Sequence, residues 1–371
     1  MPRGPRAGAL CLARSGLFDF RDGRAATILT ASQRSKRTAT ATRRGALSVK
    51  LFILFNGASG HLDPEAVRTT ISEVLLGAAR EHEFLRVERA DALPQMAALA
   101  VRNAQQARGA VVVAGGDGTI NAVAQQVCGS GVPLGVVPCG TFNYFARAHA
   151  IPLATDAAAR ALLDGAVRPV QVGRVNGRVF LVNASLGLYP TLLEDREAYK
   201  RQYGRNRLVA LWAAVVTLLR EHRQIAVFAE HDGEPTALRT PTLFVGNNPL
   251  QLEHVGVPEA ASLQRGRLAA LAARPVGTLA LLGLALRGAL GRLGESQNLI
   301  HFAFRRMTVR PAQRYGPQRF KAALDGEIVW MRAPLVFEIA DEPLPLLVPA
   351  PPPQQQAGSI AASAVASAES G

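Results

Sequence analysis

The hydrophobic and polar positions follow two different patterns in the two halves of the chain. In the first half, short apolar runs alternate with segments whose apolar residues recur every three or four positions. This alternation of strand and helix periods predicts a parallel α/β sheet. The predicted strands lie at 47–55, 84–90, 111–113 and 133–138, and the predicted helices at 64–81, 93–108, 120–127 and from about 142 onward.

The pattern changes near residue 170, where short apolar runs separated by turn residues replace the helical period. Asn176-Gly177 stands between two such runs and predicts a β-hairpin. Further strands are predicted at 225–230, 236–246, 268–272, 302–309, 322–330 and 335–339, and helices at 206–222 and 278–293. This half is therefore predicted to be a mainly β, sandwich-like domain.

These patterns divide the chain into five parts. Residues 1–46 form a basic arm, and residues 350–371 form a tail rich in Pro, Gln and Ala; both are predicted to be disordered. Between them lie an α/β domain at 47–168 and a mainly β domain at 169–342. Residues 343–349 are expected to pack back on the first domain.

The net charge of +14 is concentrated at one end of the chain. Residues 1–50 hold 11 Lys and Arg against 2 Asp. Such an arm could contact nucleic acid, anionic lipid or nothing at all. Because a basic tail is usually solvated, we expect no nucleic-acid partner. The three cysteines, Cys11, Cys128 and Cys139, have neither the number nor the spacing of a disulfide framework or a zinc site, which indicates a reducing compartment.

The apolar runs are too short to cross a membrane. The longest ones, 208–219 and 276–286, fall well below the roughly 20 residues that a spanning helix needs. The apolar pieces of the N-terminus are shorter than a signal-peptide core and are broken by charge, so no secretion is predicted. We expect a cytoplasmic protein that touches the inner face of the membrane without spanning it.

One strand of the first half ends in a run of glycines, in the stretch "VVVAGGDGTIN". Gly115, Gly116 and Gly118 let backbone amides approach a bulky anion, because no Cβ atom intervenes. The helix that follows adds its own free amides and its dipole. Thr119 can cap that helix or donate to a phosphate oxygen, whereas Asp117 would repel a phosphate unless it holds a cation, a ribose or a backbone amide.

Two further strands end in turns of similar build. One turn contains Gly140-Thr141 and Asn143, and the other contains Asn56 and Ser59-Gly60. Because the carboxyl ends of parallel strands meet at one edge of a sheet, the three turns predict a nucleotide site there. They match neither a Walker A loop nor a G-x-G-x-x-G fingerprint, so the residues alone indicate only a phosphate-rich nucleotide.

Taken together and in this order, the motifs resemble the diacylglycerol kinase catalytic family, bacterial lipid kinases related to sphingosine and ceramide kinases. "FNGASG" is similar to the family's N-P-x-S-G, "GGDGTINAVAQQV" to G-G-D-G-T-x-x-E-V, and "PCGTFNYFARAHAIP" to P-x-G-T-x-N-D-x-A-R-x-x-x-I-P. Later in the chain, "FVGNN" and "ALDGEIV" resemble the family's glycine-asparagine strand end and its D-G-E motif. Phosphofructokinases and NAD kinases share a GGDG loop, but not the third run or the D-G-E. The likeness covers about residues 50–349.

This resemblance implies an ATP-dependent lipid kinase with an α/β ATP-binding catalytic domain and a β-sandwich domain that presents the lipid. ATP with Mg²⁺ would lie in the cleft, beside the hydroxyl of diacylglycerol or a sphingoid-type lipid at the membrane surface; a homodimer is left open. Glu327 would accept the proton of the lipid hydroxyl, with Asp325 beside it at the cleft. The residues implied to hold the nucleotide are Asn56, Ser59, Gly60, Gly115, Gly116, Asp117, Gly118, Thr119, Thr141 and Asn143.

The chain departs from the family pattern at several positions. Gly57 replaces a proline, whereas Ala122 and Tyr144 replace acids near the site. Gln264 and Arg265 replace the two acids that hold a structural Mg²⁺ in many bacterial members. Since the fixed positive charge of an arginine opposes a hard cation, we expect that second metal site to be absent.

Three alternatives remain open from the sequence. "DGE" could be only a β-turn in an exposed hairpin. The missing acids favour a nucleotide- or lipid-binding regulator without turnover, and the GGDG loop would also suit a soluble-substrate kinase of the NAD kinase type. The apolar segments "LVALWAAVVTLL" and "TLALLGLALRGAL" could contact acyl chains or form ordinary core.

Overall fold

The structure is a computed structural model that describes residues 49–56, 63–194, 224–231, 233–312 and 319–350. These residues belong to one compact unit, Gly45–Gly371. The predicted arm at 1–46, the predicted helix at 206–222 and the predicted tail beyond residue 350 lie outside the described residues.

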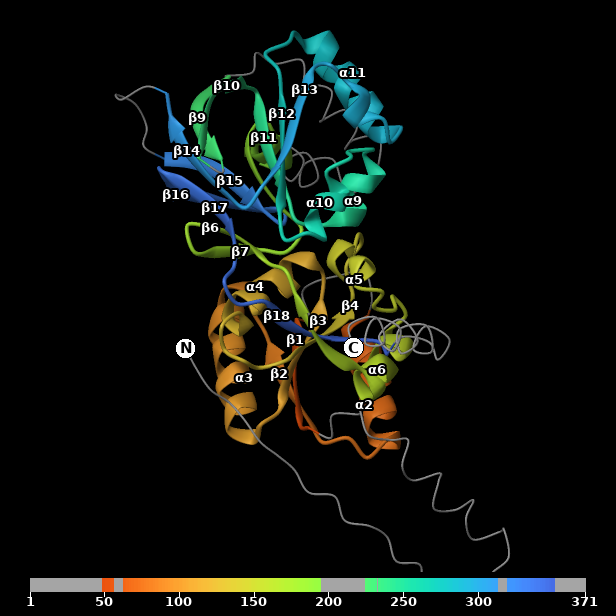
Figure 1. Ribbon diagram of the computed structural model, residues 1–371. Helices are drawn as coiled ribbons and strands as arrows, with labels where there is room; N and C mark the ends of the chain where they lie inside the picture. Colours follow the sequence, from red (N-terminus) through yellow and green to blue (C-terminus); the bar gives the residue numbers. More distant parts are fainter. Residues whose placement is uncertain (1–48, 57–62, 195–223, 232, 313–318, 351–371) are drawn as a thin grey trace, which may run out of the picture. The chain divides into compact units, whose positions relative to one another are not determined.

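The first sheet has six strands in the order β2-β1-β3-β4-β18-β5 (Figure 1). Its first four strands are parallel neighbours: β2 (His82–Val87), β1 (Leu51–Asn56), β3 (Ala110–Gly115) and β4 (Leu134–Pro138). The strand β18 (Leu344–Val348) then pairs parallel with β4 and antiparallel with β5 (Ala166–Val170). The chain thus returns from the second half to complete the first sheet.

Helices cover both faces of this sheet. They are α2 (Pro64–Gly77), α3 (Leu93–Ala107), α4 (Asp117–Val127), α5 (Tyr144–Ala148) and α6 (Thr155–Asp164), with the short turn η1 (Ala90–Ala92) before α3. Val111 and Val113 of β3 pack into one apolar core with α3 and α4, whereas Val112 and Ala114 pack into a second core with α2 and α6. A strand that is buried on both faces explains the unbroken β-branched run in its sequence.

Two helix ends of the first domain differ from the predicted ones by three or more residues. The helix α2 ends at Gly77 instead of residue 81, because Ala79 adopts a left-handed conformation (φ 49°) and the Arg80 amide turns back to the Leu75 carbonyl. The helix α4 begins at Asp117, three residues earlier than predicted, because Gly116 is its extended N-cap. The second difference brings the whole GGDGT turn to the tip of a helix.

The second half contains two six-stranded sheets. One has the order β10-β9-β14-β17-β6-β7: β10 (Glu234–Thr240), β9 (Ile225–His231), β14 (Arg306–Pro311), β17 (Leu335–Ile339), β6 (Gly173–Val175) and β7 (Arg178–Phe180). The other has the order β13-β12-β11-β8-β15-β16: β13 (Leu299–Phe304), β12 (Leu268–Ala273), β11 (Thr242–Gly246), β8 (Asn183–Gly187), β15 (Arg319–Leu324) and β16 (Glu327–Arg332). These two sheets share one buried core, which contains Phe180 of β7, Phe337 of β17, Leu186 of β8 and Phe304 of β13.

The predicted fold class, a parallel α/β domain with a mainly β sandwich-like partner, is confirmed. Antiparallel pairing joins the strands within each sheet of the second half, including the hairpin β6–β7 predicted at Asn176-Gly177. This half also holds the helices α9 (Pro249–His254), α10 (Ala260–Leu263) and α11 (Thr278–Ala289) and the short turn η2 (Leu293–Glu295).

Three segments predicted as single strands are pairs of strands. The segment at 236–246 is broken at Pro241, and the segment at 302–309 is broken at Arg305, because in each case the chain crosses from one sheet to the other there. The segment at 322–330 is a hairpin whose turn residues, Asp325 and Gly326, have φ angles of 47° and 91°. Two positive φ angles are typical of the tight turns that suit β-hairpins.

Candidate active site

The turns after β3 and β4 pack backbone against backbone. A Cβ atom built on Gly140 would lie 2.7 Å from Gly116 Cα and 2.8 Å from Asn143 Oδ1, so neither glycine turn has room for a side chain at this contact. A Cβ atom on Gly115 would likewise lie 2.7 Å from Thr119 Cβ. The glycines therefore bring two strand ends and the first turn of α4 together.

Asn143 closes the second turn. It has a left-handed conformation (φ 51°), its Oδ1 accepts from the Gly140 amide at 2.9 Å, and its Nδ2 donates to the Gly140 carbonyl at 2.8 Å. Thr141 is left exposed at the tip of the turn, and Phe142 stacks on Tyr144 with a centroid distance of 5.7 Å. Asn143 is thus a structural part of the loop that carries Thr141.

The carboxylate of Asp117 lies at the start of α4 and also caps α5. Its oxygens accept from the Tyr144 amide at 3.3 Å and from the Phe145 amide at 3.2 Å. The sequence left open whether Asp117 holds a cation, a ribose or a backbone amide, and in the structure it accepts from backbone amides. Asp117 therefore couples the first glycine turn to the second.

The hairpin β15–β16 brings Asp325 into the junction between the two halves. Asp325 Oδ2 accepts from Asn121 Nδ2 at 2.6 Å and from the Leu181 amide at 2.7 Å, and Oδ1 accepts from the amides of Val182 and Asn183, both at 2.8 Å. Burial raises the pKa of Asp325 to about 6, while these four hydrogen bonds act in the opposite direction. "DGE" is a β-turn, but its aspartate is tied to α4 and to the start of β8.

Glu327 has a different environment two residues later. Its side chain is exposed, and a Cβ atom built on Gly118 would lie 3.1 Å from Glu327 Oε1. The carboxylate therefore lies next to the first turn of α4, whose backbone amides have no partner within the helix. Among the residues that the structure describes, no hydrogen-bond donor holds the Glu327 carboxylate in place.

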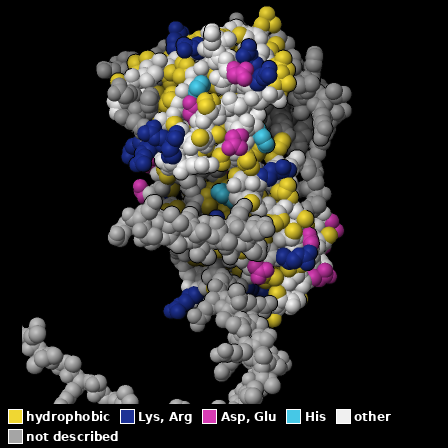
Figure 2. All heavy atoms as spheres, turned by 45° about the vertical axis from the view of Figure 1, so that its right-hand side comes forward, with side chains coloured by type: hydrophobic (Ala, Val, Ile, Leu, Met, Phe, Trp, Pro, Cys, Tyr) yellow, Lys and Arg dark blue, Asp and Glu magenta, His cyan; other side chains and the backbone are white. Residues whose placement is uncertain are grey.

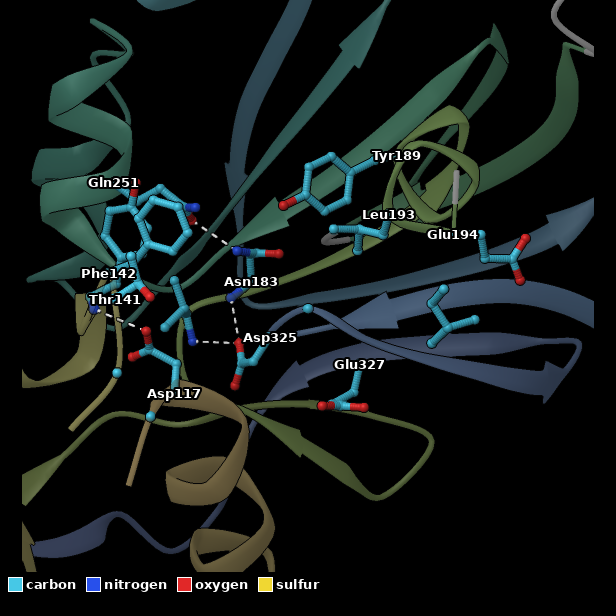
Figure 3. A pocket seen from close by; sticks show the side chains of 16 residues that line it. Asp117, Thr141, Phe142, Asn183, Tyr189, Leu193, Glu194, Gln251, Asp325 and Glu327 are labelled. Atoms are coloured by element: carbon cyan, nitrogen blue, oxygen red, sulfur yellow. Dashed lines mark hydrogen bonds between the residues drawn. The ribbon is translucent and has the colours of Figure 1, made fainter. Parts of the chain in front are cut away.

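These elements surround a pocket of about 870 Å³ (Figure 3). Its lining residues are Gly116, Asp117, Gly140, Thr141, Phe142, Tyr144, Val182, Asn183, Tyr189, Leu193, Glu194, Gln251, Asp325, Gly326, Glu327 and Ile328. Both halves of the chain contribute to this set. The pocket therefore lies between the glycine turns and the β15–β16 hairpin.

The predicted site residues are distributed unevenly around this pocket. Those that line it are Gly116, Asp117, Thr141, Asp325 and Glu327, and Gly118 adjoins Glu327. Gly115, Thr119 and Asn143 support the turns from behind, and Thr119 and Asn143 are buried. Asn56 is the last residue of β1, while Ser59 and Gly60 lie outside the described residues.

Several lining residues were not predicted, and Asn183 is the most informative. It is only 5% exposed; its Nδ2 donates to Gln251 Oε1 at 3.0 Å, whereas its Oδ1 is buried without a hydrogen-bond partner among the described residues. A buried acceptor without a donor is costly and marks a place for a ligand or a water. No local sequence pattern points to Asn183, because its neighbours at the pocket come from distant segments.

Four carboxylates line the pocket, whereas its described lining contains no Lys or Arg. Asp325 is engaged by four donors, and Glu194 pairs with Lys321 at 2.6 Å. Asp117 and Glu327 therefore remain as the acids with capacity for a ligand. A pocket of this charge would bind a phosphate group through backbone amides and would need a cation to offset its acids.

Gln264 and Arg265 lie outside this pocket, at the end of α10. The Arg265 guanidinium donates to Ser262 Oγ at 2.9 Å. Nearby, His301 Nδ1 lies 2.6 Å from Glu259 Oε1. Within the described ranges, no group of three or more His, Cys, Asp or Glu side chains is arranged to hold a metal ion.

The comparison with protein families decides the assignment of the first domain. Residues 50–175 match the model of the diacylglycerol kinase catalytic domain. The resemblance inferred from the motifs is thereby confirmed over this segment. The glycine turns lie inside the matched domain, whereas Asp325 and Glu327 lie outside it.

Curated relatives match parts of the chain. A "Probable lipid kinase YegS-like" of Pseudomonas aeruginosa is 49% identical over 79 residues, or 21% of this chain and 26% of that protein. The "Diacylglycerol kinase" of Bacillus subtilis is 35% identical over 128 residues, or 33% and 41%. "Probable lipid kinase YegS" of Escherichia fergusonii is 34% identical over 159 residues, or 41% and 51%. The chain thus matches about a quarter to a half of the length of these relatives.

Solved structures resemble the chain over a longer stretch. A crystal structure of a diacylglycerol kinase from Bacillus anthracis aligns with a TM-score of 0.59 at 18% identity, covering 81% of this chain and 97% of that one. At this identity the likeness concerns the fold, and it extends through both the α/β and the β-rich halves.

Proposed function

We propose that the chain is an ATP-dependent lipid kinase that transfers the γ-phosphate of ATP to the hydroxyl of diacylglycerol or a sphingoid-type lipid. One observation carries the proposal: the Glu327 carboxylate of the second half lies against Gly118, in the first turn of α4. A proton acceptor beside an anion-binding helix end is what phosphoryl transfer to a hydroxyl requires.

The nucleotide half of the site would use backbone groups. The start of α4, where backbone amides have no partner within the helix, lines the pocket through Gly116 and Asp117, and the exposed Thr141 lines it as well. The β- and γ-phosphates of ATP would bind between Gly116 and Gly118. The close contact of Gly116 with Gly140 keeps side chains away from this position.

Magnesium fits the donor set of the pocket. Hard cations prefer oxygen ligands, and Asp117 is the lining acid that lies at the helix tip with only two amide contacts of 3.2 and 3.3 Å. Asp117 would hold Mg²⁺ directly or through water. When bound with ATP, the ion would neutralise charge on the phosphates.

Glu327 would act on the acceptor. It takes the proton of the lipid hydroxyl while that oxygen bonds to the γ-phosphorus, the bond from the γ-phosphorus to the bridging oxygen breaks, and ADP leaves. The unpartnered Asn183 Oδ1 would accept a hydrogen bond from another polar group of the lipid head. Tyr189, Leu193 and Ile328 offer apolar wall beside these polar groups, which favours a lipid over a soluble acceptor.

Asp325 would position these groups without contacting the reacting atoms. Its carboxylate is fully used by four N–H donors from α4 and residues 181–183. Those contacts orient Asn183 and fix the hairpin that carries Glu327. We therefore assign Asp325 a positioning role and Glu327 the proton-accepting role.

The test is transfer of labelled γ-phosphate from ATP to a panel of lipids in mixed micelles, with NAD as a soluble acceptor. We expect label in a diacylglycerol or sphingoid lipid, a loss of transfer in Glu327→Gln, and no loss in the control Glu73→Gln, an exposed position on α2. ATP binding without transfer to any acceptor would indicate a regulator, and label in NAD would indicate a soluble-substrate kinase. Either result would overturn the proposal.

A further inference from the structure

The helix α11 (Thr278–Ala289) presents large apolar side chains to solvent. Leu279 is 84% exposed, Leu286 is 62% exposed and the C-cap residue Leu290 is 66% exposed. Their spacing of seven and four residues puts the three leucines on one face of the helix. Exposed leucines that gather on one face mark a contact site more often than leucines scattered singly.

The opposite face of α11 is the one that packs on the protein. Leu281 and Leu284 are buried in an apolar cluster with Leu188. At about 100° per residue, these two side chains point roughly away from the exposed leucines. The helix therefore has two apolar faces, and only one of them is covered within the described residues.

The charges around α11 are mainly positive. Arg274, Arg287 and Arg292 are exposed, and no Asp or Glu occurs from residue 274 to residue 294. One exposed acid, Glu295, follows this segment and lines a small pocket together with Arg287. Figure 2 turns this side of the molecule forward and shows Lys and Arg side chains beside hydrophobic ones on its upper part, with some Asp or Glu side chains among them. Exposed leucines flanked by arginines suit the interface of an anionic bilayer, where apolar side chains enter the acyl boundary and cations remain at the phosphates.

The covered face of α11 leads to the candidate active site. Leu281 and Leu284 contact a cluster that contains Leu188 and Leu192. Those two residues alternate along a helical segment with Tyr189 and Leu193, which line the pocket. The helix thus backs the apolar wall of the pocket.

We propose that α11 is a membrane-docking helix, in which Leu279, Leu286 and Leu290 insert into an anionic phospholipid bilayer and Arg287 and Arg292 bind lipid phosphates. The docking itself does not depend on catalysis. Its link to lipid phosphorylation rests on the function proposed above, because a docked α11 would hold the apolar wall of the pocket close to the lipid surface.

A second copy of this chain fits the exposed face less well. If two copies packed their leucine faces together, the three arginines beside each helix would approach those of the other copy, with only Glu295 of each copy close by to offset them. An anionic bilayer offers the opposite charge to the same arginines. The charge pattern therefore favours lipid as the occupant.

Vesicle sedimentation of the full chain tests the proposal, using phosphatidylcholine vesicles with about 30% phosphatidylglycerol and vesicles of phosphatidylcholine alone. We expect Leu286→Gln/Leu290→Gln to weaken binding to the mixed vesicles at least about tenfold, since each leucine loses much of its transfer free energy. Arg287→Gln/Arg292→Gln should weaken it by about tenfold on mixed vesicles and little on neutral ones.

The matched control is Leu76→Gln/Leu153→Gln, because both leucines are exposed (66% and 40%) and lie in the first domain. It should bind as the wild type does. All variants keep the basic segment 1–50, so binding through that segment alone would leave Leu286→Gln/Leu290→Gln unchanged and would overturn the proposal. A wild-type dimer that this variant dissociates, together with no vesicle binding, would assign the face to a second copy.

Insertion can also be observed directly. Leu286→Trp should show a blue shift of its added emission when mixed vesicles are present, whereas Leu76→Trp should not. A red, unshifted emission from position 286 in vesicle-bound protein would contradict insertion. Neither readout depends on catalysis. A chain that binds vesicles but transfers no phosphate would therefore contradict the proposed function and leave the docking proposal intact.

Discussion

The glycine turns after β3 and β4 and the hairpin β15–β16 face the same pocket but are built differently. The turns are defined by missing side chains: Gly116 and Gly140 touch, and backbone amides are the groups that we propose for phosphate binding. The hairpin is defined by two carboxylates, of which Asp325 is held by four donors and Glu327 is exposed. Binding should therefore depend on backbone shape in the first region, and chemistry on single side-chain atoms in the second.

The largest effect is expected where the backbone shape is broken. Gly140→Ala would place a methyl group 2.7 Å from Gly116 Cα, so the two turns must separate. We expect ATP affinity and turnover to fall beyond detection, with a loss of about 1–3 kcal/mol in the free energy of unfolding. Gly77→Ala is the control, because a Cβ atom there meets nothing within 4 Å. Normal ATP affinity of Gly140→Ala in calorimetry would contradict the backbone account.

The next effect concerns the acid that belongs to the glycine turns. Asp117→Ala removes the cap of α5 and the carboxylate that would hold Mg²⁺. We expect the affinity for ATP with Mg²⁺ to fall at least about tenfold, and the free energy of unfolding to fall by about 0.5–2 kcal/mol. The exposed Asp164→Ala should change neither. If Asp117→Ala loses stability alone and binds ATP normally, Asp117 is a structural cap only.

A third substitution separates the two acids of the hairpin. Asp325→Asn keeps a residue that tolerates the positive φ of the turn, but its amide nitrogen cannot accept the hydrogen bonds that the carboxylate accepts. We expect the free energy of unfolding to fall by about 1–3 kcal/mol, measured by denaturant titration. Asp341→Asn, at an exposed position, is the control. Unchanged stability would show that the four contacts at Asp325 do not join the two halves.

The smallest effect is a pH dependence within the first domain. Burial lowers the pKa of His149 to about 4, and its ring packs on Phe145 at 4.7 Å. Because the unfolded chain binds this proton near pH 6.5, His149 should lower the free energy of unfolding by about 1–2 kcal/mol between pH 7 and pH 5. His149→Gln should remove that part of the slope. If the free energy of unfolding of the variant has the same pH slope, His149 takes up its proton equally well in the folded and unfolded chain, as a ring in contact with water would.

The sequence predicted the glycine turns well and the pocket only in part. Gly115 to Thr119 and Gly140 to Asn143 follow buried strands, and both signals are local. Asn183, Tyr189 and Gln251 reach the pocket through pairing of distant strands, which no local pattern contains. For the same reason, the local pattern predicts one strand at 236–246 and one at 302–309, although each segment crosses between sheets.

We propose that Glu327, and not Asp325, exchanges the proton. The direct test is single-turnover transfer of labelled γ-phosphate together with ATP affinity, for the wild type and for Glu327→Gln. Glutamine keeps the shape but lacks the basicity of the carboxylate, so the account predicts a loss of at least about 100-fold in the transfer rate with nearly unchanged ATP affinity. Near wild-type transfer by Glu327→Gln, with no transfer by a folded Asp325→Asn protein, would contradict it and reverse the two roles.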